Sequence, residues 1–294
     1  MNARAGFVAV VGRPNVGKST LVNALAGAKA SIVSRRRQTT RGIVRAICRR
    51  KQAELILLDS PGWQTARRDK FNLRLNGGAQ WAAAAADVVL FMATPAWTEE
   101  DAAFLESLPK NSPLAAAVNK IDLVKNKRAL LPVADKLRQA RDFAFIMPLC
   151  ASSGEGVLRL ADQIAALLPE SPALFDGEDA ECRDFFFAEL LREKIFRALG
   201  DELPYRIGVI AKCESGDGKI LRVAAEIYAE RDSQKAVVIG AGGAMLKKLA
   251  AAARRDMERA AGRKIFLSVR VIVRPQWRRD ARLLAQMRIG APPE

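Results

Sequence analysis

Histidine is absent from the 294 residues, which excludes every histidine-dependent acid–base mechanism and removes the commonest zinc ligand. The four cysteines, Cys48, Cys150, Cys182 and Cys213, are far apart and form no C-x-x-C pair, so neither a disulfide framework nor a cysteine metal site is indicated. No run approaches the ~18 uninterrupted apolar residues of a membrane span, and no secretory leader pattern is present near the first residues. We therefore expect a cytoplasmic protein in a reducing compartment.

The charge is strongly positive, at +16, and it is unevenly distributed. Residues 1–168 carry 25 basic and 13 acidic residues, residues 169–205 carry 4 and 10, and residues 206–294 carry 19 and 9. Two basic blocks joined by an acidic, proline-containing connector indicate two domains and favour a polyanionic partner. We expect a first domain at 1–168, an acidic linker at 169–182 and a second domain at 183–290.

A phosphate-binding loop follows the first apolar run. Phe7 to Val11 is typical of a short buried strand, and residues 12–19, GRPNVGKS, match G-x-x-x-x-G-K-S/T at every fixed position. Glycines allow backbone N–H groups to close on an anion, and the helix that follows directs its positive end at the phosphates. A simple glycine turn is the alternative, which four fixed positions in a strand–loop–helix context disfavour. The expected nucleotide contacts are Gly12, Arg13, Pro14, Asn15, Val16, Gly17, Lys18, Ser19 and Thr20.

Two further motifs fit a nucleotide switch. Thr39 and Thr40 lie in a stretch, 34–51, that holds eight basic residues and no acid. A threonine there can give its hydroxyl to Mg²⁺ while the γ-phosphate is present, and the residues alone leave both threonines open. Asp59 ends an apolar strand and is followed by Gly62 in the D-x-x-G arrangement, which suits Mg²⁺ and γ-phosphate binding. We expect Lys18, the switch threonine, Asp59 and Gly62 to support catalysis, and Ser19, that threonine and Asp59 to hold the metal.

The base is predicted to be guanine. Asn119-Lys120-Ile121-Asp122 follows an apolar strand about 100 residues after the phosphate-loop lysine, where N-K-x-D is informative. We expect Asp122 to be a buried carboxylate that accepts from two guanine N–H groups, which adenine does not offer in that arrangement. Asn119 can tie this segment to the phosphate loop. Cys150 and Ala151 occupy the next strand end, where the Ala151 N–H is expected to reach guanine O6.

Trp63 stands directly after Gly62, where Ras-type GTPases place the glutamine that orients water. Gln64 is one residue further and should point elsewhere. We therefore expect slow intrinsic hydrolysis, with Trp63 as a hydrophobic anchor of the second switch loop. Alternating strands and helices across 1–168 predict an α/β fold with a doubly wound, mostly parallel sheet.

The second domain contains the pattern of a KH module. A helix at 187–199, strands at 205–213 and 219–231, a glycine turn at 240–243, a helix and a final strand at 265–273 form an α+β unit, with a short strand before the turn left as an option. A G-x-x-G turn that opens a helix can clamp single-stranded RNA, although each nearby basic residue could instead belong to a solvated face. The expected RNA contacts are Val238, Ile239, Gly240, Ala241, Gly242, Gly243, Lys247, Lys248, Arg254 and Arg255.

Taken together, GRPNVGKST, QTTR, DSPG, NKID, ELPY and VIGAGG resemble the Era-type family of bacterial GTPases across essentially the whole chain. The resemblance implies a Ras-like GTPase domain of the TrmE-Era-EngA group, a C-terminal type II KH domain, and GTP or GDP with Mg²⁺ as ligands. It implies binding of the 3′ region of 16S rRNA, a role in 30S subunit maturation, a monomeric state and peripheral association with the inner face of the cell membrane. It also selects Thr40 as the switch threonine and implies that Asn15 could coordinate K⁺.

The sequence departs from the family pattern at two places. Cys150 replaces the usual serine, and no basic residue lies between Gly240 and Gly243. Two other interpretations remain open. One is a GTPase that serves another assembly, a tRNA-modification or cell-cycle and membrane complex, and uses its C-terminal module for protein contact. The other is an RNA-binding scaffold without turnover, which the retained phosphate-loop and switch residues disfavour.

Overall fold

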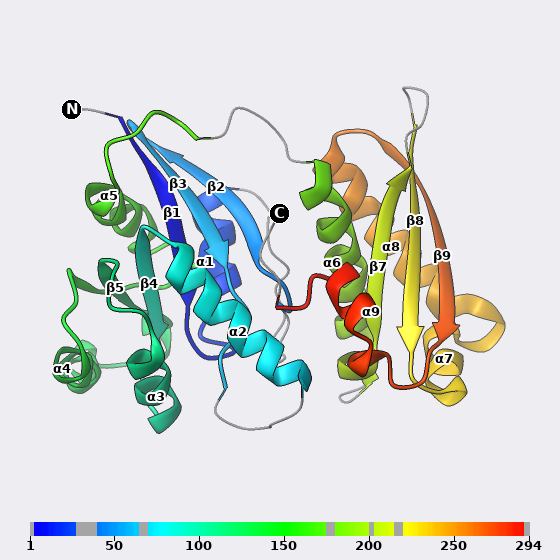
Figure 1. Cartoon of the computed structure of the whole chain (residues 1–294), viewed down its shortest axis with the longest axis horizontal. Helices are drawn as coiled ribbons and strands as arrows, with labels where there is room; N and C mark the ends of the chain where they lie inside the picture. The colour runs from blue at the N-terminus through cyan, green and yellow to red at the C-terminus, as the bar shows by residue number, and fades with distance from the viewer. Residues whose placement is uncertain are drawn as a thin grey trace. The chain divides into compact units, whose positions relative to one another are not determined.

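The computed structural model describes residues 3–27, 40–64, 70–174, 180–199, 203–214 and 220–290. The chain divides into two compact units (Figure 1), one made of Met1–Gly177 with Gly290–Pro293 and the other of Glu178–Ile289 with Glu294. The domain limits expected from the sequence stay predictions.

The first unit is built on a six-stranded sheet whose order is β2-β3-β1-β4-β5-β6. Every neighbouring pair is parallel except β2 and β3, which form an antiparallel hairpin. This arrangement confirms the predicted doubly wound, mostly parallel sheet, in which ligands bind at the carboxyl ends of the strands. The strands are β1 Arg4–Val11, β2 Val44–Arg50, β3 Ala53–Asp59, β4 Val88–Ala93, β5 Leu114–Val118 and β6 Ile146–Pro148.

Helices cover both faces of this sheet. On one face α1 and α5 pack residues such as Leu21 and Leu160 against Val8 and Leu57. On the other face α2, α3 and α4 contribute a second core around Phe91 and Phe104. The sequence did not predict α2 or α4. The helices are α1 Lys18–Ala26, α2 Lys70–Ala85, α3 Glu99–Ser107, α4 Leu131–Ala140 and α5 Val157–Leu167, with short 3-10 turns η1 Ile121–Leu123 and η2 Lys127–Leu130.

The second unit has a three-stranded sheet of order β7-β8-β9, in which β8 is antiparallel to β7 and parallel to β9. Its elements confirm the expected KH-type order, with one correction. The optional strand before the glycine turn is instead a helix, α7. The elements are α6 Ala180–Ala198, η3 Leu203–Arg206, β7 Gly208–Glu214, β8 Ile220–Ala229, α7 Asp232–Ile239, η4 Ala241–Gly243, α8 Ala244–Ala261, β9 Lys264–Val273, η5 Trp277–Arg279 and α9 Ala281–Gln286.

The two faces of this sheet are covered differently. Helices α6 and α8 lie against one face, as Figure 1 shows, and bury its alternating apolar residues. On the opposite face η5 and α9 cover one end of β7, where a Cβ on Gly208 would approach the Met287 side chain to 2.5 Å and the Trp277 ring to 3.1 Å. Glycine at 208 therefore leaves room for the Met287 and Trp277 side chains on this face of the sheet.

Within the described part of the chain, no single helix combines the length and apolar composition of a membrane span. Only α7 and α8 taken together, across a bend of 44°, meet that criterion.

Trp277 should anchor the C-terminal segment of the second unit. Its side chain is fully buried, and its Nε1–H donates to the Arg206 carbonyl over 3.0 Å. We expect Trp277→Ala to lower the free energy of unfolding of this unit by about 3–5 kcal/mol, and Trp277→Phe to lower it by about 1 kcal/mol through loss of the hydrogen bond. Urea denaturation followed by circular dichroism would measure both. Phe266→Ala is the control: with its side chain 59% exposed, it should change stability by less than about 0.5 kcal/mol, and an equal loss in both alanine variants would contradict the anchoring role.

Candidate functional site

The phosphate loop joins β1 to α1 in a conformation that two of its glycines make accessible. Gly12 has φ +148° and Gly17 has φ +102°. A Cβ at Gly12 would lie 2.4 Å from the Met92 carbonyl oxygen, and one at Gly17 would lie 2.2 Å from Nδ2 of Asn119. Any side chain at either position would force the loop open, so the glycines of the motif are required both by backbone angle and by space.

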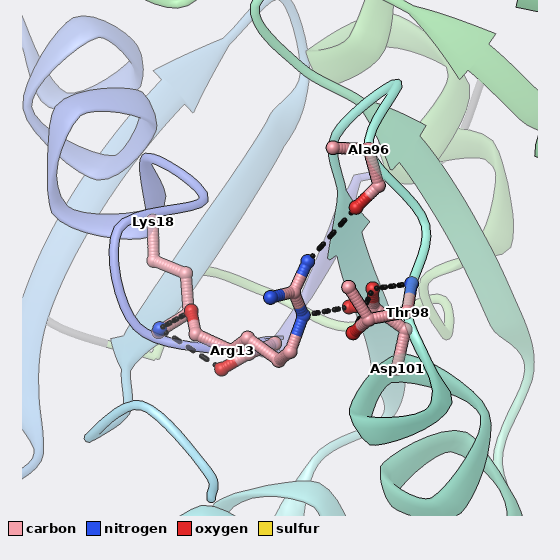
Figure 2. A network of polar contacts seen from close by, with 6 residues as sticks. Arg13, Lys18, Ala96, Thr98 and Asp101 are labelled. Atoms are coloured by element: carbon pink, nitrogen blue, oxygen red, sulfur yellow. Dashed lines mark hydrogen bonds and ion pairs between the residues drawn. The ribbon is translucent and has the colours of Figure 1, made fainter.

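Lys18 closes the loop on itself. Its Nζ donates to the carbonyl oxygens of Gly12 at 3.0 Å and Arg13 at 2.9 Å, as Figure 2 shows. The side chain is buried, and this burial lowers the pKa of Lys18 to about 8, against the opposing effect of the Asp59 carboxylate. The loop therefore holds a poorly solvated ammonium, and the phosphates of a nucleotide would supply the negative charge that stabilises its protonated form.

Three oxygen-bearing side chains converge beside Lys18. Ser19 Oγ donates to Asp59 Oδ2 over 2.6 Å and lies 2.9 Å from Thr40 Oγ1, which is 3.5 Å from the same carboxylate oxygen. They come from the start of α1, the segment before β2 and the end of β3. Two hydroxyls and a carboxylate are hard oxygen donors of the kind Mg²⁺ prefers, so the predicted ligand set fits the metal. Thr39, the alternative switch residue, lies outside the described residues.

The Arg13 side chain points toward α3, and the contact of the Arg13 residue with the nucleotide stays a prediction. Its Nε donates to Asp101 Oδ1 over 2.6 Å, and its Nη2 donates to the Ala96 carbonyl over 3.0 Å (Figure 2). Asp101 is fully buried and also accepts from the backbone N–H of Thr98 at 2.9 Å and its hydroxyl at 3.1 Å. The main chain of Arg13 thus stays in the phosphate loop, while its guanidinium fixes this loop to the start of α3.

Trp63 contacts the same helix. Its ring stacks on Phe104 of α3 with centroids 4.9 Å apart and an interplanar angle of 13°, and the backbone N–H of Trp63 donates to the Gly12 carbonyl over 3.3 Å. The side chain is only 9% exposed, as the anchor role predicts. At Gly62 a Cβ would come within 2.7 Å of Pro14, so this glycine keeps the second switch loop close to the phosphate loop.

Asn119 ties the base-binding segment to the phosphate loop, as predicted. Its Nδ2 donates to the Val16 carbonyl over 2.8 Å, and its Oδ1 accepts from the Ala151 N–H over 2.9 Å. The second bond differs from the expectation, because the Ala151 N–H serves Asn119 here and its contact with guanine O6 stays a prediction. Lys120 follows with φ +64°, which directs the chain into η1.

Asp122 is exposed in the structure, and its burial against a guanine base stays a prediction. Asp122 lies two residues after Lys120, whose backbone is left-handed, and its side chain is accessible to solvent. Cys150 orients it: the thiol Sγ donates to Asp122 Oδ1 over 3.1 Å and lies 3.2 Å from Ser152 Oγ. The cysteine that replaces the usual serine therefore retains a hydrogen bond to the base-recognising carboxylate.

The glycine turn of the second unit is open to solvent. Gly240, Gly242 and Gly243 have φ +72°, +56° and +81°, and the Gly243 N–H donates to the Gly240 carbonyl over 3.1 Å at the start of α8. Ala241 and Gly242 are exposed, and Ile239 is partly buried. Val238 is fully buried in the core, which corrects its assignment as an RNA contact. The predicted basic contacts are all exposed on α8: Lys247, Lys248, Arg254 and Arg255.

Comparisons with known proteins cover both units. A family model described as a 50S ribosome-binding GTPase matches residues 7–120, and a KH domain model matches residues 202–278. Over 279 residues, 94% of each chain, the sequence is 43% identical to GTPase Era of Stenotrophomonas maltophilia. Over 287 residues, 97% of each chain, it is 40% identical to GTPase Era of Nitrosomonas eutropha.

Two solved structures are similar over nearly the full length, each at 31% identity and a TM-score of 0.90. One is a tyrosine-to-alanine variant of Aquifex aeolicus Era bound to GDP·AlF4⁻, which matches 98% of this chain and 100% of its own. The other is Era in complex with MgGDPNP and nucleotides 1506–1542 of 16S ribosomal RNA, which matches 99% and 100%.

The ion pair between Arg13 and Asp101 should control how tightly the phosphate loop holds its ligand. We expect Arg13→Ala to destabilise the first unit by about 2–4 kcal/mol, because a buried carboxylate loses its cation, and to accelerate GDP dissociation about tenfold. Fluorescent-GDP release and urea denaturation would measure the two effects. Thr98→Ala is the matched control, since it removes only a cap hydrogen bond worth about 1 kcal/mol and should leave GDP release unchanged. Equal release rates in both variants would contradict the prediction.

The lowered pKa of Lys18 predicts proton uptake on nucleotide binding. Phosphates stabilise the ammonium, so binding raises its pKa from about 8, and affinity should fall as the pH rises through that value. At pH 8 we expect uptake of about 0.5 proton, measured by calorimetry in buffers of different ionisation enthalpy. Lys18→Arg, a cation that does not titrate in this range, should bind without uptake. Uptake that is the same in both proteins would assign the proton to another group.

Proposed function

This chain belongs to the Era family of GTPases, and from that premise we propose that it is a GTP-dependent switch that binds 16S rRNA near its 3′ end and assists maturation of the 30S ribosomal subunit. The protein is a GTPase with a phosphate-loop domain followed by a KH domain. The observation that carries the proposal is the full-length similarity to an Era chain bound both to MgGDPNP and to nucleotides 1506–1542 of 16S rRNA.

The switch rests on residues that meet at the phosphate loop. In this proposal Lys18 would bind the β- and γ-phosphates, and Gly62 would give its N–H to the γ-phosphate. Ser19, Thr40 and Asp59 would hold Mg²⁺, which neutralises phosphate charge during transfer. The γ-phosphate and the metal would add contacts to Thr40 beyond those it makes with Ser19 and Asp59, so hydrolysis would weaken the hold on Thr40.

Turnover without a partner should be slow. The Trp63 ring is held on Phe104, and its indole N–H can donate a hydrogen bond but cannot accept one from an attacking water. The attacking water must therefore be positioned by backbone groups, by a cation or by the RNA-bound partner. Asn15, at the exposed turn of the phosphate loop with φ +64°, is our candidate ligand for K⁺ in that role. A cytoplasmic location, a monomeric state and peripheral membrane association are further parts of this proposal.

Binding of an RNA that copies the 3′ end of 16S rRNA tests the proposal. We expect tighter binding in the presence of a non-hydrolysable GTP analogue than with GDP, and faster phosphate release when the RNA is present. The double variant Ala241→Asp and Gly242→Asp places two carboxylates in the glycine turn and should lower RNA affinity at least about tenfold by repelling phosphates, while basal GTP hydrolysis is unchanged. Absence of RNA binding by the native protein, or sedimentation with 50S rather than 30S subunits, would refute it.

A further inference from the structure

The KH-domain sheet has a second face that neither α6 nor α8 covers. Directly opposite residues of neighbouring strands share a face, and every second residue along a strand returns to it. The side chains of Tyr228 and Ile272 therefore lie on the same side as Gly208. The same register places Arg222 opposite Phe266 and Ile220 opposite Lys264 further along this side. We call this side the outer face.

The outer face is covered at one end only. At the Gly208 end, Trp277 and Met287 pack on the strands and are themselves buried. At the other end Phe266 is 59% exposed and Ile220 is 54% exposed. Figure 1 shows the strands β8 and β9 in front of α8, with α9 confined to the region of β7. A large aromatic side chain thus stands on an open part of a rigid sheet.

Basic side chains surround this aromatic residue. Arg222 is its cross-strand neighbour, Lys264 and Arg270 lie on the same face of β9, and Lys212 lies on β7. All four are exposed, and within the part of the chain that the structure describes none of them forms an ion pair.

Other arginines of the same unit are neutralised. Arg206 pairs with Glu230 over 3.1 Å, and Arg274 pairs with Asp280 over 3.2 Å. Two glutamates share the outer face with the four exposed cations, Glu214 opposite Arg222 and Glu226 opposite Arg270. The open end of the face therefore has a net positive charge beside an exposed aromatic ring. This combination suits an anionic partner that carries planar rings.

We propose that the outer face is a second RNA-binding surface, on which a base stacks on Phe266 while Arg222, Lys264 and Arg270 contact the flanking phosphates. Aromatic side chains on an open sheet stack bases, and free cations beside them bind the backbone. A protein partner fits less well, because an apolar area of two side chains is small and four cations would need matching carboxylates. The inference rests on the RNA binding proposed above and extends it to a site separate from the glycine turn.

The topology gives the RNA a route between the two sites. The glycine turn at Gly240–Gly243 clamps about four nucleotides in domains of this kind. Strand β9 is the edge of the sheet, so a longer strand that leaves the turn can reach the outer face by crossing β9. Lys264 and Arg270 belong to this edge strand. We therefore expect the outer face to matter for long RNAs and not for short ones.

The test compares RNAs of about 6 and about 24 nucleotides copied from the 3′ end of 16S rRNA, titrated against the full-length protein. Phe266→Ala should weaken binding of the longer RNA about 5- to 150-fold, the range of one lost stacking contact, and leave the shorter RNA unaffected. Phe266→Trp should bind like the native protein, whereas Phe266→Leu should bind like the alanine variant. Arg222→Ala should reduce the slope of log K against log salt by about 0.7.

The matched control is Leu158→Ala with Arg159→Ala on α5, because these residues are also an exposed apolar and an exposed basic side chain. This control should bind both RNAs normally. Native-like binding of the longer RNA by Phe266→Ala, or by Phe266→Leu, would overturn the stacking proposal. Failure of the native protein to bind either RNA would instead overturn the proposed function. Binding of the shorter RNA should depend on Ala241 and Gly242 but not on Phe266, so this RNA tests the proposed function independently of the stacking proposal.

Discussion

A buried cation determines the geometry of the nucleotide site. Lys18 is held by two carbonyl oxygens of its own loop, with the Asp59 carboxylate near enough to oppose the loss of its charge. Such an arrangement leaves the positive charge incompletely compensated, which is unfavourable until an anion arrives. The glycines that wrap the loop, the helix that starts at Lys18 and the oxygen cluster of Ser19, Thr40 and Asp59 all follow from the need to place phosphates against this ammonium.

Helix α3 gives that site its rigidity. Its first turn holds Arg13 through Asp101, and its next turn supports Trp63 through Phe104. The phosphate loop and the second switch loop therefore both contact α3, although neither loop is adjacent to this helix in the sequence. A disturbance in α3 would reach both loops at once, whereas a disturbance in α4 or α5 would reach them only through the core.

The sequence predicted what is encoded locally, and it failed where long-range packing decides. The phosphate loop, Asp59 and Asn119 each end a parallel strand, so their meeting at one edge of the sheet could be inferred from order alone. Asp101 was visible as a first-turn acid, but nothing in the sequence marks it as the partner of a residue 88 positions earlier. The run Val237 to Ile239 has strand-like composition, yet it forms the end of α7, where Val238 packs into the core and the Gly240 N–H donates to the Ala236 carbonyl. The apolar spacing of α4, with Val133 and Leu137, was an available signal that was missed.

The stacking of Trp63 on Phe104 also has a consequence for populations. An offset aromatic pair contributes about 0.5–1.5 kcal/mol beyond its area, which is one to three times the thermal energy. This contribution adds to that of the area the ring buries, and together they set the minor fraction of molecules in which the ring leaves Phe104 without a ligand to drive it. The second switch loop would then sample its released form spontaneously, and a partner that stabilises this form need only select it.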